Sequence, residues 1–130
     1  MRRGHLLDAS ALLALLFREP GAEEVVKLID DCEVHAVNLA EVVRRLMKAG
    51  AAAEEVERVP GELGLEVLET VSAADAFAAG KLGFEARAQG LSTGDCVCLA
   101  VAERTERAVV TADRRWSEVA GVRVRVVQIR

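Results

Sequence analysis

The sequence predicts an α/β fold, a three-layer α/β/α domain whose central, mostly parallel sheet has about five strands. Three observations lead to this class. Short runs rich in β-branched residues alternate along the chain with longer segments of helical periodicity. Hydrophobic residues make up 52% of the chain but aromatic residues only 3%, so Leu, Val and Ala must build the core, which suits helices packed on a sheet. The 130 residues suffice for one buried core, so we expect a single domain over residues 1–130.

Five segments are expected to form the strands, because each is short, apolar or alternating, and bounded by turn-forming residues. In chain order they are GHLLDAS (4–10), EVHAV (33–37), GLEVLE (64–69), RAVVTAD (107–113) and VRVRVVQI (122–129). The first leaves through Asp8 into a helix. The last alternates apolar and polar residues most regularly, which predicts an edge strand with one solvated face.

Six segments between these strands have apolar residues at helical spacing. They cover residues 10–17, 22–31, 38–50, 51–59, 72–90 and 93–104. Asn38 is expected to cap the third of these helices, and Pro60–Gly61 to end the fourth. The sixth is apolar nearly all round, so it is expected to be buried. Because helices alternate with strands, they are expected to cover both faces of the sheet.

Charge and cysteine content exclude several classes of protein. The net charge is −4, so no overall positive field attracts nucleic acid, and a polyanionic partner must be held by local arginines or by bound cations. Cys32, Cys96 and Cys98 match neither zinc-ligand spacing nor an even disulfide framework, and we expect them to be small buried residues in a reducing cytosol. No run approaches the roughly 18 apolar residues of a membrane span. We therefore expect a soluble cytoplasmic protein with no membrane partner.

Four acids are expected at one edge of the sheet. Asp8 follows the first expected strand and Asp113 ends the fourth. Glu41 lies in the first turn of the helix that leaves the second strand, and Asp95 in the first turn of the buried helix. In an open parallel sheet, ligands bind outside the carboxyl ends of the strands, where the strand order reverses. The sequence thus predicts a group of carboxylates at the ligand-binding edge.

Each acid also has a purely structural explanation. The two acids on helices stand three residues after Asn38 and Ser92, the spacing of a capping box, and the helix dipole favours an acid in a first turn. Asp8 would serve equally as a helix cap, and Asp113 as the acceptor of an Asx turn. Asp75 has the same capping pattern, but no short strand delivers it to that edge, so we assign it a structural role.

The convergence of four carboxylates favours a metal site. Such a group repels itself unless cations lie between its members. Oxygen ligands without a neighbouring Cys or His cluster suit Mg²⁺ or Mn²⁺ rather than zinc. One or two such ions activate water and stabilise the charge on a phosphodiester undergoing displacement. No side-chain nucleophile is required, and His5 and His35, both in strand positions, are expected to be packing or surface residues.

Small polar and basic residues accompany the acids. Ser10, Asn38 and Thr111 are expected to hold the carboxylates in place by hydrogen bonds. Ordinary capping is the alternative for the first two. Arg114 and Arg115 stand at the mouth of the expected site, where they would contact substrate phosphate, and a solvated turn is the alternative. Arg18 or Arg44 would add to these contacts.

Four segments together resemble the PIN-domain family. They are LLDASALLALLFREPGAEEV (6–25), AVNLAEVVRRL (36–46), GLSTGDCVCLAVAER (90–104) and VVTADRRW (109–116), in the order and spacing of that family. Within the family, the sequence is most similar to the VapC-type toxin ribonucleases of toxin–antitoxin systems, and the resemblance covers nearly the whole chain. One departure is STGDC, where family members often carry a bulkier residue before Gly-Asp and a basic one after it, which puts substrate contacts there in doubt.

The resemblance implies a Mg²⁺- or Mn²⁺-dependent endoribonuclease that leaves a 3′ hydroxyl and a 5′ phosphate. It implies that the acidic quartet consists of Asp8, Glu41, Asp95 and Asp113. It further implies a homodimer and a cognate antitoxin whose tail covers the active site. In such proteins the helices around residues 44–64 help form the antitoxin groove. Here Leu46, Met47 and Val56 supply apolar side chains that look exposed, although core packing would explain them as well.

Two other functions stay open. A receiver-type phosphoacceptor module also binds Mg²⁺ at acids on the edge of a parallel sheet, but it places a lysine after the last strands. The lysines here, Lys27, Lys48 and Lys81, lie elsewhere. A catalytically silent PIN-like interaction domain is the second alternative, and the intact set of four acids argues against it.

Overall fold

The computed structural model describes residues 2–119 and 121–130. Its centre is one sheet with the strand order β3-β2-β1-β4-β5, in which every neighbouring pair is parallel. The strands are β1 (His5–Leu7), β2 (Cys32–His35), β3 (Glu66–Leu68), β4 (Ala108–Thr111) and β5 (Val126–Gln128). The predicted α/β class and the five-stranded sheet are confirmed, and the sheet is parallel throughout its described length.

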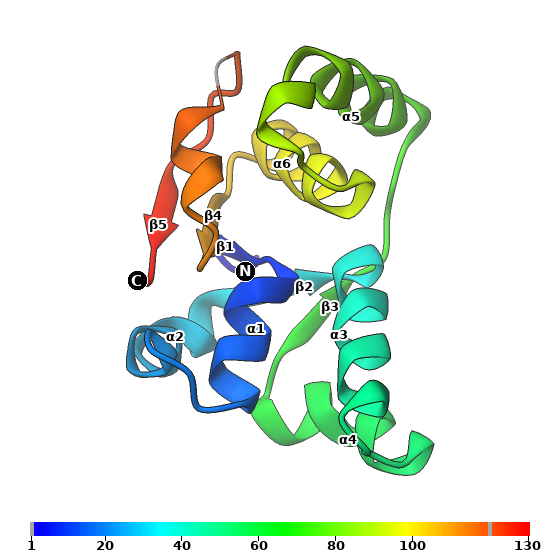
Figure 1. The fold of residues 1–130 in the computed structure, drawn as a ribbon, viewed down its shortest axis with the longest axis vertical. Helices are drawn as coiled ribbons and strands as arrows, with labels where there is room; N and C mark the ends of the chain where they lie inside the picture. Colours follow the sequence, from blue (N-terminus) through cyan, green and yellow to red (C-terminus); the bar gives the residue numbers. More distant parts are fainter. Residues whose placement is uncertain (1, 120) are drawn as a thin grey trace.

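Helices cover both faces of this sheet (Figure 1). On one side lie α1 (Ala9–Leu16), α2 (Ala22–Leu28), α3 (Ala36–Lys48) and α4 (Ala53–Leu63), and on the other α5 (Ala73–Glu85) and α6 (Thr93–Thr105). The short 3₁₀ helices are η1 (Ile29–Asp31), η2 (Arg87–Gln89) and η3 (Arg114–Glu118). The three layers follow from the alternation of strands and helices along the chain.

Side chains that alternate along the central strands divide the core into two clusters. Leu7 and Val110 pack with α1, α2 and α3, whereas Leu6 and Val109 pack with α5 and α6. Trp116 of η3 is buried in the second cluster. All three cysteines are buried and free, as expected from the sequence.

The strand order places a ligand-binding edge between β1 and β4. The chain runs outward from β1 to β2 and β3, and then returns through α5 and α6 to add β4 on the other side of β1. The order therefore reverses between β1 and β4, and in folds of this type the carboxyl ends of two such strands border a crevice. Asp8 directly follows β1, and Asp113 follows shortly after β4.

α3 begins at Ala36, and the predicted Asn38 cap is wrong. The N-cap is His35, whose Nδ1 accepts a 3.1 Å hydrogen bond from the amide of Val37. A buried histidine at the end of β2 thus takes the role that the pattern assigns to the nearest Asn. Asn38 is fully buried inside the helix, and Glu41 lies in the second helical turn rather than the first.

α4 passes through Pro60 and Gly61, so the predicted end at that pair is wrong. The helix continues to Leu63 and stops where Gly64 takes a left-handed conformation with φ 65°. The amide of Leu65 then donates to the carbonyl of Pro60 at 2.9 Å, which satisfies a carbonyl at the helix end. Pro60 removes one backbone donor close to the C-terminus of the helix, and the glycine cap, rather than the proline, sets the end.

Other elements are shorter than predicted. The helix expected over residues 72–90 is capped at Ala86, which separates α5 from η2, and the last strand is confined to Val126–Gln128 at the sheet edge. Val56 of α4 is only 3% exposed, because it faces the core, so the expectation of an exposed side chain is wrong there. Met47 is 46% exposed, as expected.

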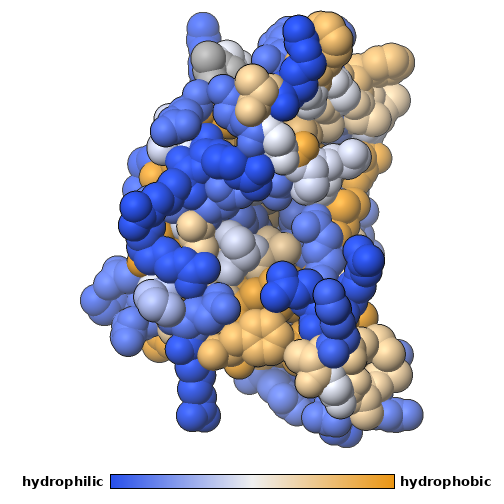
Figure 2. Space-filling model, viewed as in Figure 1, coloured by the Kyte–Doolittle hydropathy of each residue, from blue (hydrophilic) through white to orange (hydrophobic). Residues whose placement is uncertain are grey.

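The surface carries a pair of exposed aromatic side chains on α5. Hydrophilic residues dominate the face shown in Figure 2, and apolar residues gather at its upper right, over α5. Phe77 and Phe84 of this helix are 70% and 68% exposed. Exposed apolar side chains grouped on one element are typical of a contact surface. Across residues 2–119 and 121–130, no helix has both the length and the apolar character that a bilayer crossing requires.

Candidate active site

A crevice of about 320 Å³ opens at the carboxyl ends of β1 and β4. It is lined by side chains from four segments of the chain, and all four predicted acids are among them. The lining residues are Asp8, Ala9, Ser10, Leu13, Glu41, Arg44, Arg45, Ser92, Asp95, Asp113 and Arg115. Residues far apart in the sequence therefore meet at the edge where the strand order reverses.

Asp8 is almost completely buried at the end of β1, where it also caps α1. Its Oδ1 accepts a 2.8 Å hydrogen bond from the amide of Ala11, and both carboxylate oxygens accept from the hydroxyl of Ser10 at 2.8 Å. The hydroxyl of Thr111, at the end of β4, donates to Oδ2 at 2.5 Å. Burial and, to a smaller extent, the charge of Asp95 together raise the pKa of Asp8 to about 6, against the lowering effect of these hydrogen bonds.

Glu41 is half-buried on α3 and points toward the start of α6. Asn38 donates from Nδ2 to Glu41 Oε1 at 3.4 Å and to the carbonyl of Gly94 at 3.2 Å, which ties the two helices together. Burial and the charge of Asp95 raise the pKa of Glu41, and the Asn38 contact lowers it. A Cβ atom at Gly94 would collide with Glu41 Oε1, so only glycine leaves room for the carboxylate.

Asp95 occupies the first turn of α6 in a capping box with Ser92. The amide of Ser92 donates to Asp95 Oδ2 at 2.9 Å, and the amide of Asp95 donates to Ser92 Oγ at 3.1 Å. The predicted capping arrangement is thus present, and the acid lines the crevice as well. Its charge raises the pKa values of both Asp8 and Glu41, so the three acids share one electrostatic environment.

Asp113 caps η3 and is paired with Arg115. The amide of Arg115 donates to Asp113 Oδ1 at 3.0 Å, and the guanidinium Nη2 lies 2.5 Å from Oδ2. Hydrogen bonding to this guanidinium lowers the pKa of Asp113. Arg114 does not line the crevice, since its Nε donates instead to the carbonyl of Arg130 at 3.3 Å.

The donor chemistry of the crevice fits a hard divalent cation. Asp8, Glu41 and Asp95 supply carboxylate oxygens, and their mutual repulsion is the kind that a cation relieves. In the arrangement of the described residues, no three His, Cys, Asp or Glu side chains lie close enough together to hold one ion. Shared coordination therefore requires rotation of carboxylates, and the half-buried Glu41 and Asp95 have more room for it than Asp8.

Two basic residues of the crevice lie on α3, and of these only Arg45 was not selected from the sequence. Arg44 and Arg45 follow Glu41 by three and four positions on α3, so they share its helix face and line the crevice beside it. This spacing is the signal that finds them once the acid is assigned.

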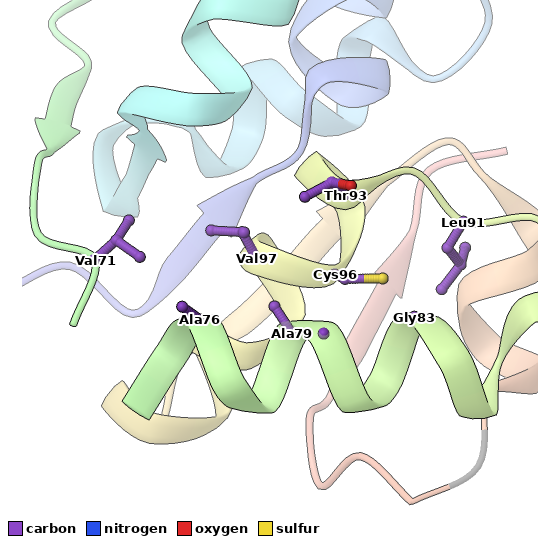
Figure 3. Close-up of a pocket in the computed structure, with 9 residues that line it drawn as sticks. Val71, Ala76, Ala79, Gly83, Leu91, Thr93, Cys96 and Val97 are labelled. Carbon is purple, nitrogen blue, oxygen red and sulfur yellow. The ribbon is translucent and has the colours of Figure 1, made fainter. Parts of the chain in front are cut away.

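A second cavity, of about 390 Å³, lies between α5 and α6 (Figure 3). Small and apolar side chains of the two helices form its wall, with Val71 and Leu91 at the sides. The lining residues are Val71, Ala76, Ala79, Gly80, Gly83, Leu91, Thr93, Cys96 and Val97. No acid or base is among them, so the chemistry of the described residues concentrates in the crevice at β1 and β4.

Solved structures of toxin–antitoxin proteins have the same fold. A DNA-bound VapBC structure from Salmonella typhimurium matches with a TM-score of 0.70 and 20% identity, over 97% of this chain and 98% of that one. A toxin–antitoxin complex from Klebsiella pneumoniae matches with a TM-score of 0.72 and 18% identity, over 97% and 98%. A VapBC family member from Mycobacterium tuberculosis matches with a TM-score of 0.63 and 23% identity, over 96% and 98%. At these identities the likeness is one of fold.

The sequence itself carries the family assignment. No curated protein matches this sequence. The family model described as the PIN domain matches residues 5–122, which include the four acids of the crevice and every strand but the last. The chain therefore belongs to the PIN domain family.

Proposed function

We propose that this chain is a metal-dependent endoribonuclease that acts as the toxin of a type II toxin–antitoxin pair. Members of the PIN domain family are nucleases, which supports a hydrolase acting on phosphodiester bonds. The observation that carries the proposal is the crevice at β1 and β4, where the charge of Asp95 raises the pKa values of Asp8 and Glu41. Acids that disfavour one another's ionised form at a ligand-binding edge are typical of a cation site.

Asp8, Glu41 and Asp95 are proposed as the ligands of one Mg²⁺ or Mn²⁺ ion. Asp113 would complete this site or hold a second ion only if its carboxylate were released from Arg115. These cations prefer carboxylate oxygens, and no Cys or His is found among the described residues that line the crevice. When bound, such an ion activates water for attack and neutralises the charge that develops on the phosphodiester.

Neighbouring side chains orient the proposed ligands. Thr111 and Ser10 donate hydroxyl hydrogen bonds to Asp8, and Asn38 donates an amide hydrogen bond to Glu41. These bonds connect β4, α1 and α3 to the carboxylates, so the direction of each acid is fixed by regular elements rather than by loops.

Arg44 and Arg45 are proposed to bind RNA phosphates. Both line the crevice beside the acids, and the described part of the chain offers neither of them an ion pair. Their charges compensate locally for a net charge of −4, which would otherwise repel a polyanion. Arg114 lies outside the crevice and Arg115 is engaged by Asp113, so α3 is the better source of phosphate contacts.

The antitoxin is proposed to bind an apolar groove between α1, α3 and α4. Two of the similar structures are described as VapBC from Salmonella typhimurium and as a toxin–antitoxin complex from Klebsiella pneumoniae. The groove has a volume of about 250 Å³, and Leu16, Leu46 and Val59 supply its apolar wall. Glu55 and Arg58 lie at the same groove, so a helix with one apolar and one charged face would be complementary to it.

A homodimer is proposed through α5. Phe77 and Phe84 are seven positions apart, which places both on one face of the helix, and Gly80 lies between them. Two copies of α5 that cross in opposite directions at Gly80 bring Phe77 of each copy to Phe84 of the other. The absence of a side chain at the crossing point allows close approach of the two helices.

The receiver-type alternative is wrong. Receiver modules have the strand order 2-1-3-4-5, whereas this sheet has the order β3-β2-β1-β4-β5. The described residues that line the crevice also include no lysine. The other alternative, a catalytically silent interaction domain, is distinguished from a nuclease by RNA cleavage and Mn²⁺ binding.

The test is cleavage of a panel of RNAs, and of DNAs with the same sequences, in Mg²⁺, in Mn²⁺ and in EDTA. We expect cleavage of RNA that requires the metal and that Asp8→Asn abolishes. Asp75→Asn is the matched control, because Asp75 is an equally buried capping acid outside the crevice, paired with Arg104. Cleavage that persists in EDTA or in Asp8→Asn contradicts the proposal. Absence of both cleavage and Mn²⁺ binding identifies a silent domain.

A further inference from the structure

Arg115 is held on two sides. On one side its Nε and Nη2 donate to the carboxylate of Asp113, at 2.9 Å to Oδ1 and 2.5 Å to Oδ2. On the other side its Nη1 donates to the carbonyls of Gln89 and Gly90, both at 2.9 Å. The guanidinium therefore bridges the segment after β4 and the loop before α6, which form adjacent walls of the crevice.

Most of the hydrogen-bonding capacity of Arg115 is used by these contacts. A guanidinium has five N–H donors. One on Nε and one on Nη2 point to Asp113, and both on Nη1 point to backbone carbonyls. A single N–H on Nη2 is left for a substrate phosphate, so the predicted role of Arg115 as a phosphate ligand fits these contacts poorly.

Gly90 helps to keep the guanidinium in place. Its φ is +70°, a conformation that L side chains rarely adopt, and a Cβ atom there would lie 3.3 Å from Arg115 Nη1. The neighbouring Trp116 is buried in the core and anchors η3. Arg114 is held by fewer contacts, because its one described side-chain hydrogen bond goes to the carbonyl of Arg130.

Both oxygens of Asp113 are consequently occupied. Oδ1 accepts from the amide and from Nε of Arg115, and Oδ2 accepts from Nη2 and, at 3.1 Å, from Nε. A divalent ion bound to Asp113 would have to displace the guanidinium or lie against its positive charge, which repels it strongly at contact distance.

We propose that Arg115 is a positioning residue that occupies Asp113 and so limits the metal centre to one divalent ion, held by Asp8, Glu41 and Asp95. The inference rests on the proposed metal-dependent function. In this arrangement the Arg115 guanidinium takes the place of a metal ion at Asp113. Removal of the guanidinium is therefore predicted to open a second ion site.

The test is the number of Mn²⁺ ions bound by the full chain without RNA, measured by calorimetry and by electron paramagnetic resonance. We expect one ion for the unmodified chain and two for Arg115→Gln, with a spin-coupled spectrum in the variant because both ions share one crevice. Arg114→Gln, a change of the same charge one residue away, should bind one ion. Asp113→Asn combined with Arg115→Gln should return the count to one.

The outcomes separate the two proposals. No bound ion in the unmodified chain overturns the proposed function, whereas two bound ions overturn only the role of Arg115. One ion in Arg115→Gln also overturns that role, provided that circular dichroism shows the variant folded. If it does not fold, Asp113→Asn alone decides. An unchanged ion count and an affinity within about threefold support the proposal, and any larger loss of affinity contradicts it.

Discussion

The hydroxyl of Thr111 donates a 2.5 Å hydrogen bond to Oδ2 of Asp8, and so joins the ends of two adjacent parallel strands at the crevice. Both residues are buried. The bond favours the ionised carboxylate while burial disfavours it, and burial prevails, so the pKa of Asp8 rises from 3.8 to about 6. An acid kept in a costly charged state at neutral pH is the basis of the first two predictions.

Asp8→Asn is expected to abolish cleavage without loss of stability. A pKa raised by about two units corresponds to roughly 3 kcal/mol of unfavourable free energy for the ionised acid at neutral pH, part of which the neutral amide recovers. We expect an unchanged or raised melting temperature. Asp75→Asn should do the opposite. It breaks a part-buried ion pair with Arg104, whose hydrogen bond lowers the pKa of Asp75, and should cost about 1–3 kcal/mol while cleavage is retained. Thermal denaturation and RNase assays on both variants check the pair.

The stability of the metal-free protein is expected to depend on pH through Asp8. Because the folded-state pKa of about 6 exceeds the unfolded value near 3.8, the folded protein binds more protons than the unfolded chain between these two values. The Asp8 contribution to the free energy of unfolding therefore falls as pH rises from about 4 to about 6. Urea denaturation in EDTA, compared with Asp8→Asn at each pH, isolates this contribution. A difference that is constant with pH, or that grows in the opposite direction, contradicts the assignment.

Gly94→Ala is expected to damage the site while sparing the fold. The added Cβ atom would collide with Glu41 Oε1, the end of a flexible side chain, so the carboxylate moves and the helix remains. We expect Mn²⁺ affinity to fall by about tenfold or more, in the range found when groups that orient metal ligands are lost. Gly61→Ala on α4 is the control, because nothing lies within 4 Å of its added Cβ atom. It should raise stability by up to about 1 kcal/mol and leave Mn²⁺ binding unchanged.

Phe77→Ser together with Phe84→Ser is expected to convert a dimer into a monomer. Both side chains are largely exposed on α5, so the monomer loses little packing when they are replaced. Light scattering coupled to size-exclusion chromatography, over a range of concentrations, measures the change. Val26→Ser is a control of similar kind, since Val26 is 58% exposed on α2. A monomeric unmodified chain, or a double variant that stays dimeric, excludes α5 as the interface.

The position of the acids was predictable because it depends on few structural facts. Asp8 and Asp113 need only the ends of two strands, and parallel strands carry their carboxyl ends to one edge. Glu41 lines the crevice although its expected cap was wrong. The cap lies three residues earlier, at His35 rather than Asn38, but Glu41 remains inside the same helix after the same strand.

Partners of the side chains were not predictable, because they depend on distant backbone. The carbonyls that accept from Arg115 belong to Gln89 and Gly90, and the carbonyl that accepts from Asn38 belongs to Gly94. No local pattern connects such pairs, since they meet only after α5 and α6 have packed on the sheet. The cap at His35 was missed for a related reason. A histidine seldom caps a helix, and this one is held in the capping position because its side chain is buried.

Cys98 lies fully buried in α6, behind the acids of the crevice. Burial raises the pKa of this thiol well above 9, and the charges of Asp8, Asp95 and Glu41 raise it further. Since alkylating reagents attack the thiolate, Cys98 is inert to iodoacetamide as long as α6 stays packed on the sheet. The rate at which Cys98 is labelled, followed by mass spectrometry, would therefore measure how often α6 separates from the sheet.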